Sequence, residues 1–218
     1  MNRFFYILIT ACLFMFTSCG KDDDEKGTSS PTSDKGIIIN GTKWATRNVD
    51  APGTFVKNPE DAGMFYQWNS KIGWSATDPM VNSNGGTLWV YPWNGGYSVS
   101  GSGQWDKINN PCPIGWRIPT RQELQSLADA DSEWTTINGV KGRKFGSGAN
   151  SLFLPAAGHR FTDGVLYAVG INGEYWSSTV YRTSSYEFVS SSGYVEVIAV
   201  DTKESVRAAG LSCRCVAE

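Results

Sequence analysis

The sequence predicts an α+β fold: a twisted antiparallel sheet, one or two helices and long ordered loops. Two asparagine–glycine pairs between strand-like segments indicate antiparallel hairpins. One capped segment with apolar residues at helical spacing indicates a helix. The stretch from Asn82 to Gly103 is rich in Gly, Asn, Ser, Trp and Tyr without a period, which is typical of a long loop.

The first hairpin is predicted over Ile37–Trp44, around Asn40-Gly41. The second is predicted over Thr135–Val140, around Asn138-Gly139. Tight turns of this kind need positive φ at both central residues, and Asn and Gly adopt it most readily. Both segments are therefore expected to be two-stranded.

The helix is predicted to begin after Thr120. Thr120 and Glu123 have the spacing of a capping box, in which each side chain accepts a hydrogen bond from the other residue's backbone. Leu124, Leu127 and Ala128 follow at helical spacing, and Pro119 precedes the cap. Five short strands are expected in the second half of the chain, at Leu152–Leu154, Tyr175–Ser178, Tyr186–Ser190, Tyr194–Val200 and Leu211–Val216.

The first 35 residues are not expected to join the fold. Arg3, the apolar run Phe4–Phe16 and the small residues before Cys19 resemble a bacterial lipoprotein signal, with residues 1–18 as the signal peptide. The resemblance implies that Cys19 is acylated and holds the protein in the outer membrane. An ordinary signal peptide with an incidental Cys is the alternative, and the apolar run is short for a membrane span.

Residues 19–35 are predicted to be a flexible acidic tether, because they carry no large apolar side chain. Lys21–Glu25 resembles the surface-export tag of Bacteroides-type lipoproteins, which implies exposure on the cell surface. A merely soluble spacer is the alternative. Residues 36–218 then form one domain with 15 basic and 16 acidic residues. This near-neutral balance argues against nucleic acid as a partner.

Three cysteines remain in the domain, Cys112, Cys213 and Cys215, so one pair and one spare thiol are expected outside the cell. Cys213 and Cys215 are two apart in a strand-like run and point to one face, which leaves them poorly placed to bridge each other. We predict a Cys112–Cys215 disulfide, with Cys112–Cys213 as the alternative.

Several longer motifs run through the domain in a fixed order. They are Trp44–Val49, Asp61–Trp68, Pro111–Thr120, Leu154–Gly158, Gly173–Thr179 and Ser212–Val216. In order and spacing they resemble the Fibrobacter-type major paralogous domain of surface lipoproteins from gut bacteria. That resemblance implies a C-type-lectin-like fold, a stable core that displays variable loops. The closing motif of the family usually has Val where this chain has Cys213.

The motifs of hydrolytic, metal and phosphate chemistry are missing. His159 is the only histidine, which excludes a His triad or a His-based metal cluster, and we expect it to be structural. No nucleophile elbow or phosphate loop is present. Asp129, Asp131 and Glu133 alternate as calcium ligands can, but such a run is more often a solvated helix exit. No enzymatic activity, metal or cofactor is therefore predicted.

The binding prediction rests on the Tyr/Ser-rich stretch after Thr179. Rigid amphipathic rings beside small hydrogen-bonding residues are typical of adaptable binding surfaces. The candidate ligand-binding residues are Tyr181, Arg182, Glu187, Ser191, Tyr194 and Glu196. An ordinary polar strand face is the alternative, and an aromatic sugar platform at Trp89, Tyr91 and Trp93 is a weaker one. Members of the resembled family are targets of diversity-generating retroelements that randomise this stretch, although Glu187, Lys203 and Glu204 are not typical products of that process.

The sequence thus predicts a non-enzymatic, lipid-anchored protein of the cell surface that binds an extracellular protein or glycan. A structural or accessory subunit of a surface assembly, such as a fimbrial tip, is the alternative. Trp116 and Trp176 are expected in the core.

Overall fold

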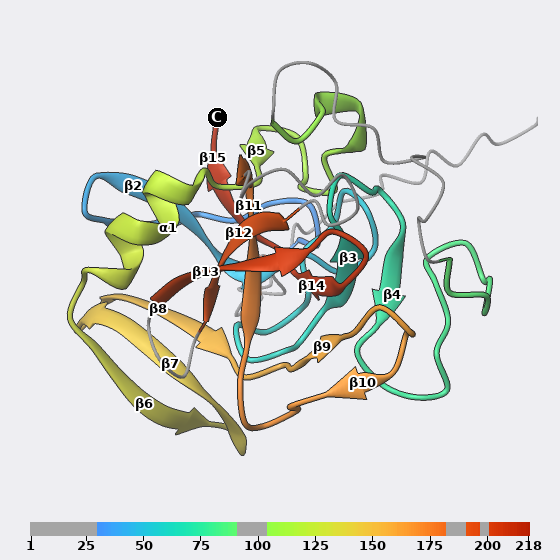
Figure 1. Ribbon diagram of the computed structural model, residues 1–218. Coiled ribbons are helices and arrows are strands. Elements are labelled where there is room, and N and C mark those ends of the chain that lie inside the picture. The colour runs from blue at the N-terminus through green and yellow to red at the C-terminus, as the bar shows by residue number, and fades with distance from the viewer. Residues whose placement is uncertain (1–29, 91–103, 182–190, 197–200) are drawn as a thin grey trace, which may run out of the picture.

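The computed structural model describes residues 30–90, 104–181, 191–196 and 201–218. Within these ranges the strands form three sheets, mostly with antiparallel pairing, accompanied by one α-helix and a short 3-10 helix, η1 (Lys107–Asn109) (Figure 1). The predicted α+β class is confirmed for the described residues. The strands are divided among three sheets, where one was expected.

The first sheet begins with β1 (Ile37–Ile39) and β2 (Thr42–Asn48), which are consecutive in the sequence and are joined by a tight turn. Their sheet continues with β15 (Arg214–Ala217) and β5 (Trp116–Arg117), in the order β1-β2-β15-β5. The first and last strands of the fold therefore lie in one sheet. Within it β2, near the start of the described chain, pairs with β15, near its end.

The largest sheet has eight strands, of which six follow the order β10-β9-β14-β11-β12-β13, while β3 pairs with β14 and with β4. The bounds are β3 (Met64–Gln67), β4 (Gly73–Ser75), β9 (His159–Arg160), β10 (Leu166–Tyr167), β11 (Glu174–Tyr181), β12 (Ser191–Glu196), β13 (Asp201–Val206) and β14 (Gly210–Ser212). All its strand pairs are antiparallel except that of β11 with β14. After β11 the chain adds β12 and β13 on one side of that strand and then crosses to its other side to form β14, which makes the β11–β14 pair parallel.

The third sheet is a meander of β6 (Ser132–Ile137), β7 (Val140–Ser147) and β8 (Asn150–Pro155). The predicted turns are present in this sheet and in the first. Asn40 and Gly41 have φ of 47° and 82°, and Asn138 and Gly139 have φ of 48° and 85°. Both predicted hairpins are confirmed, because each turn has the positive φ that its residues tolerate.

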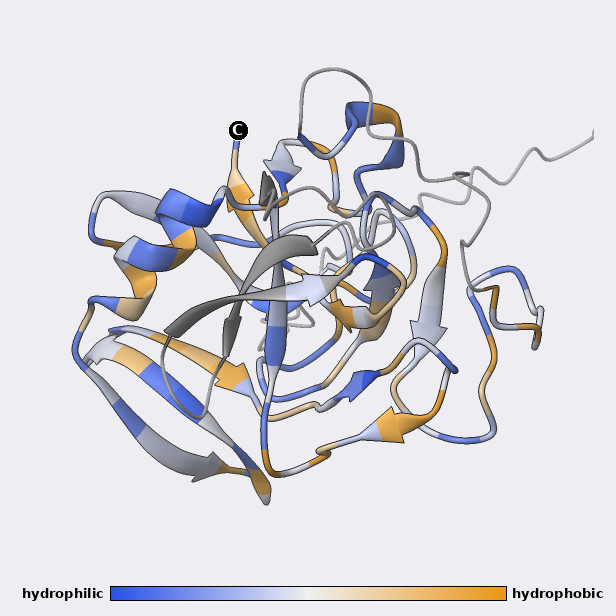
Figure 2. Ribbon diagram, in the orientation of Figure 1, coloured by the Kyte–Doolittle hydropathy of each residue, from blue (hydrophilic) through white to orange (hydrophobic). Residues whose placement is uncertain are grey.

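The predicted helix is α1 (Arg121–Ala128), and its capping box is formed in both directions between Thr120 and Glu123. Leu124 and Leu127 are the buried residues of α1. They pack with Phe145 and Leu152 from the third sheet in a core cluster that also includes Trp44. Figure 2 shows both hydrophilic and hydrophobic residues on α1. The buried Leu124 and Leu127 are three positions apart and so lie on one face, as in an amphipathic helix.

The expected strands agree with the structure to different degrees. Segments 152–154 and 175–178 lie within β8 and β11, and 211–216 is divided between β14 and β15. Segment 186–190 lies outside the described residues, as does 197–200 of the strand expected at 194–200. The strand β13 was not predicted, because Asp201–Ser205 is polar and charged; such a composition suits the edge of a sheet, where β13 lies.

A second core cluster lies between the first and the largest sheet. It contains Trp68, Trp105, Trp116 and Trp176 together with all three domain cysteines. Trp176 is fully buried and its indole Nε1 donates to the carbonyl of Tyr66 at 2.6 Å. The expectation that Trp116 and Trp176 are core residues is confirmed.

Arg214 is a fully buried cation that joins three strands. Its guanidinium donates to Asn48 Oδ1 at 2.9 Å, to the Ala45 carbonyl at 3.2 Å and to the Phe153 carbonyl at 3.0 Å. Burial lowers the pKa of Arg214 to about 10, which leaves it charged at neutral pH. Its hydrogen bonds offset the cost of burying the charge, which would otherwise be large.

Asp34 belongs to the segment that the sequence assigns to the tether, yet its carboxylate is buried. It pairs with Arg47 at 3.2 Å and accepts from the backbone of Gly36 at 2.8 Å. Ahead of it, the Pro31 carbonyl accepts from the backbone N–H of Phe55. Residues from Pro31 onward therefore contact the fold.

Candidate functional site

The Tyr/Ser-rich stretch lies between β11 and β14 of the largest sheet, in the part of the chain that we call the excursion. The chain leaves β11 after Tyr181 and returns at β14, and β11 and β14 are neighbours that pair in parallel at Tyr175 and Ser212 (Figure 1). Between them the chain forms β12 and β13, an antiparallel pair that extends the sheet beyond β11. The excursion thus begins and ends on adjacent strands.

Both ends of the excursion are held by buried groups. Trp68 Nε1 donates to the Ser177 carbonyl at 2.9 Å, and the backbone N–H of Trp68 donates to the Arg207 carbonyl at 3.0 Å. The guanidinium of Arg207 lies 4.4 Å from the centroid of the Trp68 ring. One tryptophan therefore ties the outgoing strand to the returning chain.

The backbone register locates four of the six candidate ligand-binding residues. Tyr181 is paired with Ser191, Trp176 with Tyr194, and Glu174 with Glu196. A register shift between Trp176 and Val180 separates the first pair from the others. Arg182 and Glu187 lie outside the described residues. The four described candidates, Tyr181, Ser191, Tyr194 and Glu196, thus belong to one two-stranded ribbon at the backbone level.

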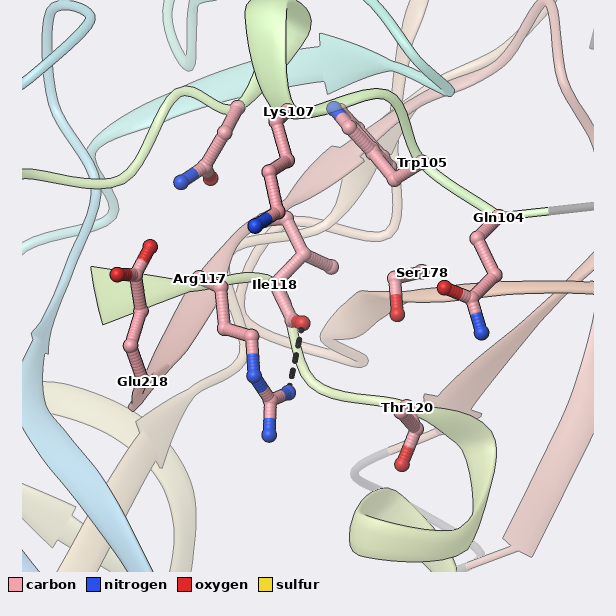
Figure 3. A pocket seen from close by; sticks show the side chains of 9 residues that line it. Gln104, Trp105, Lys107, Arg117, Ile118, Thr120, Ser178 and Glu218 are labelled. Atoms are coloured by element: carbon pink, nitrogen blue, oxygen red, sulfur yellow. Dashed lines mark hydrogen bonds between the residues drawn. The ribbon is translucent and has the colours of Figure 1, made fainter. Parts of the chain in front are cut away.

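A pocket of about 410 Å³ opens where β11 approaches α1, and we call it the β11 pocket. It is lined by Gln104, Trp105, Lys107, Asn110, Arg117, Ile118, Thr120, Ser178 and Glu218. Figure 3 shows Glu218 and Arg117 on one side and Gln104 and Ser178 on the other, with Lys107 and Ile118 between them. The lining side chains come from the loop before β5, from β5 and the α1 cap, from β11 and from the end of β15.

The charged side chains of the β11 pocket are arranged around Arg117. Its two terminal nitrogens donate to the two carboxylate oxygens of Glu123, at 2.9 and 2.7 Å. This hydrogen bonding raises the pKa of Arg117, and the negative charge of Glu218 adds to the effect. Burial pushes the pKa of Glu123 upward, but hydrogen bonds from Arg117 and Thr120 outweigh it and lower that pKa.

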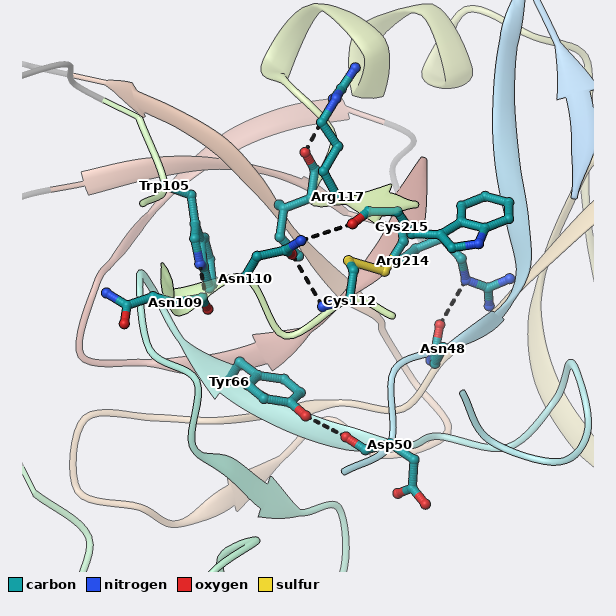
Figure 4. The surroundings of a disulfide bond; sticks show 12 residues. Asn48, Asp50, Tyr66, Trp105, Asn109, Asn110, Cys112, Arg117, Arg214 and Cys215 are labelled. Carbon is teal, nitrogen blue, oxygen red and sulfur yellow. Dashed lines mark hydrogen bonds between the residues drawn. A yellow bond between two sulfur atoms is a disulfide. The ribbon is translucent and has the colours of Figure 1, made fainter. Parts of the chain in front are cut away.

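A disulfide holds the loop that supplies several of the pocket residues. Cys112 is bonded to Cys215 across 103 residues, with a Cα–Cα distance of 6.1 Å. Asn110 accepts from the backbone N–H of Cys112 at 3.1 Å and donates to the Trp116 carbonyl at 2.8 Å (Figure 4). The predicted pairing is confirmed and Cys213 is a free, buried cysteine. Burial raises the pKa of the Cys213 thiol well above its ordinary value.

Trp89, from the alternative aromatic platform, is partly buried against scaffold residues. Its ring centroid lies 5.0 Å from that of Trp74, and its Nε1 donates to the Thr162 carbonyl at 3.0 Å. Tyr91 and Trp93 lie outside the described residues. Trp89 therefore packs against β4 and against the loop between β9 and β10.

The acidic run after α1 lies in a solvated region. Asp129 accepts from Gln125 at 2.9 Å, and Glu133 pairs with Lys144. In the part of the chain that the structure describes, no group of three or more His, Cys, Asp or Glu side chains is arranged to hold a metal ion. His159 is stacked on Tyr167 with its Nδ1 at 3.3 Å from Glu174 Oε1.

The β11 pocket was not predicted from the sequence. Its residues come from segments up to 114 positions apart in the numbering, from Gln104 to Glu218, and only the Thr120 cap carried a recognisable local signal. The motif Pro111–Thr120 contributes residues to the pocket, but its sequence does not indicate a cavity. Side chains that meet only through folding leave no spacing pattern to recognise.

Within the described residues, the single α-helix has eight residues, and no helix is long and apolar enough to cross a membrane. Comparisons with models of protein families, with curated proteins and with solved structures found no match to this chain.

Proposed function

We propose that this protein is a non-enzymatic recognition module, anchored in the outer membrane through lipid on Cys19 and exposed on the cell surface. It binds an extracellular protein or glycan through the Tyr/Ser-rich stretch, on a C-type-lectin-like fold. The observation that carries the proposal is the excursion from Tyr181 to Gly210, which starts and ends on the adjacent strands β11 and β14.

The anchoring of this excursion supports a binding role. Recognition residues are commonly placed on segments that a rigid scaffold positions, because less conformational entropy is then lost when a ligand binds. Here Trp68 and Trp176 fix the start of the excursion, and the disulfide of Cys215 lies just beyond its end.

The lectin-like architecture is supported by three features. The first two strands and the last strand lie in one sheet, where β2 pairs with β15. Within the described residues a single capped α-helix packs beside the core, and a disulfide closes most of the second half of the chain. Each feature is compatible with a core that displays its long connections at one end.

The test is a binding screen with the full chain in detergent micelles on arrays of extracellular proteins and glycans, followed by substitution. We expect Tyr181→Ala or Tyr194→Ala to weaken binding of the ligand found by at least about tenfold, because aromatic anchors carry much of the energy of an interface. The melting temperature should change little.

Two variants serve as controls for that test. Tyr167→Ala removes an exposed tyrosine of β10 that lies outside the stretch, and it should leave binding unchanged. Trp176→Ala should instead unfold the domain, at a cost of about 3–5 kcal/mol. Binding that survives both tyrosine substitutions would contradict the assignment of the ligand to this stretch.

A structural subunit of a surface assembly is the second candidate function, and the position of β13 favours it. Among the described strands, β13 is at one edge of the largest sheet, with β12 on its one paired side. Such an edge can accept a strand from another protein. Concentration-dependent self-assembly, measured by analytical ultracentrifugation, would favour this function over ligand recognition.

A further inference from the structure

We infer that the β11 pocket is a binding site for one terminal monosaccharide unit of a neutral glycan. This goes beyond the recognition role proposed above, because none of the lining residues belongs to the stretch from Tyr181 to Glu196. The inference rests on the size of the pocket, its charge balance and its unpartnered polar side chains.

The size and construction of the pocket suit a small ligand. Its volume of about 410 Å³ lies within the range of small-molecule sites, roughly 300–1,000 Å³. Part of the lining is fixed in place: the Cys112–Cys215 disulfide holds the loop, and Asn110 is bonded to the backbone on both sides. A preformed site loses less conformational entropy when a ligand enters.

The charges of the lining favour a neutral ligand. The guanidinium of Arg117 is already neutralised by its two hydrogen bonds with Glu123. The remaining charges are one ammonium, on Lys107, and one side-chain carboxylate, on Glu218. Because these two side chains carry opposite charges, the side chains of the lining have no excess charge with which to select an anion or a cation.

The polar side chains that have no partner supply both donors and acceptors. Within the described residues, the Gln104 amide, the Lys107 ammonium and the Ser178 hydroxyl make no side-chain hydrogen bond. An amide and a hydroxyl both donate and accept, an ammonium only donates, and a carboxylate only accepts. A sugar hydroxyl also does both, so a ring of hydroxyls can satisfy this mixed set. A carboxylate ligand could only accept.

An apolar surface adjoins these groups. Ile118 and Trp105 line the pocket, and Trp105 is held by donation from its Nε1 to the Asn109 carbonyl at 2.9 Å and by contact with Trp68, at 5.5 Å between ring centroids. A pyranose has a face of C–H groups beside its belt of hydroxyls. Polar groups beside a small apolar surface fit that amphipathic shape.

The test is saturation-transfer difference NMR on the full chain in lauryldimethylamine oxide micelles, whose headgroup is not a sugar. The probes are the methyl glycosides of glucose, galactose, mannose and N-acetylglucosamine, with sodium acetate and sodium phosphate as separate arms. We expect saturable transfer to at least one glycoside at millimolar concentration. Absence of saturable transfer to all four, or competition by acetate or phosphate, would overturn the inference.

Substitutions then assign the signal to the pocket. We expect Gln104→Ala and Lys107→Ala each to weaken glycoside binding about fivefold to tenfold, because each removes hydrogen bonds to the ligand. Lys71→Ala is the matched control, since Lys71 is also an exposed lysine but does not line the pocket. Ser178→Phe should abolish binding by filling the cavity. Glycoside binding that is unchanged in both Gln104→Ala and Lys107→Ala would place the sugar elsewhere.

The two tests fail independently. Loss of array binding in Tyr181→Ala with glycoside binding intact would support the Tyr/Ser-rich stretch and the β11 pocket as separate sites. Glycoside binding that falls in the tyrosine variants but not in the pocket variants would overturn the pocket assignment alone.

Discussion

Gly158 lies where the chain passes from β8 to β9, and it has almost no space for a side chain. Its φ is +76°, and a Cβ atom there would lie 2.2 Å from the Tyr167 carbonyl oxygen and 2.9 Å from the Val169 nitrogen. Both neighbours are backbone atoms, so neither can rotate away. Both the packing and the backbone conformation therefore require glycine at position 158, the last position of the Leu154–Gly158 motif.

We expect Gly158→Ala to lower the free energy of unfolding by about 2 kcal/mol or more, because it adds a steric clash to the strain of positive φ. Gly170→Ala is the control, since Gly170 has φ of +71° but no atom within 4 Å of the added Cβ. It should cost only about 1 kcal/mol. Urea denaturation followed by tryptophan fluorescence measures both, and equal losses would show that the clash is relieved without cost.

At the scale of elements, α1 connects the two parts of the molecule that the proposals concern. Its first turn forms one wall of the β11 pocket through Thr120, and the helix contacts β11, β12 and β13. The Glu123 carboxylate serves three partners there: it accepts from the Thr120 backbone at 2.7 Å, from the Thr120 hydroxyl and from Arg117. The stability of this junction should therefore depend on the ionisation of Glu123.

We expect Glu123→Gln to destabilise the protein at neutral pH by about 1 kcal/mol, the usual size of a helix-cap effect. The folded-state pKa of Glu123 lies below its ordinary value of 4.5, so the carboxylate stabilises the fold above that pH. Its contribution is lost as the pH falls through the lowered pKa. The difference from wild type should therefore shrink in acid.

Chemical denaturation between about pH 3 and pH 7 checks this dependence. Glu133→Gln provides the comparison, because Glu133 is also paired with a cation but is 62% exposed. Exposed pairs contribute little, so this variant should differ from wild type by a few tenths of a kcal/mol at any pH. A loss for Glu123→Gln that does not change with pH would show that its role is not electrostatic.

At the scale of the whole molecule, the Cys112–Cys215 disulfide closes a loop that contains α1, the third sheet and the entire excursion. We expect the double substitution Cys112→Ala with Cys215→Ala to cost about 4–5 kcal/mol, the chain-entropy value for a loop of this size. Cys213→Ala should keep the disulfide and cost about 1 kcal/mol. Thermal unfolding measures the losses, and non-reducing peptide mapping identifies the bridge; a Cys112–Cys213 linkage would contradict the pairing.

The proposed location is also a property of the whole chain. Cys19→Ala should release or mislocalise the protein, because it removes the acylation site. Replacing Asp22, Asp23, Asp24 and Glu25 with Ala should leave the protein lipidated but facing inward. Protease shaving of intact cells distinguishes the two outcomes, and a tag variant that is cleaved as readily as wild type would contradict surface export.

Elements with local signals were predictable from the sequence. The Asn40-Gly41 and Asn138-Gly139 turns and the cap of α1 depend on residues at most three apart, and the structure confirms all of them. The disulfide was predictable because three cysteines leave few pairings. The strand β13 was missed since its polar composition has no apolar alternation, and an edge strand does not need one.

The sequence alone determined the α+β class, both hairpins, the helix start and the tryptophan-rich core, because each follows from side chains close together in the chain or from apolarity itself. Only the tertiary structure decided the parallel pairing of β11 with β14, the buried partners of Arg214 and Asp34, and the existence of the β11 pocket. These features join residues that are far apart in the sequence. Two of the hydrogen bonds of Arg214 go to backbone carbonyls, which any type of residue can supply. Such contacts are decided by how the strands pack, and no spacing in the sequence records them.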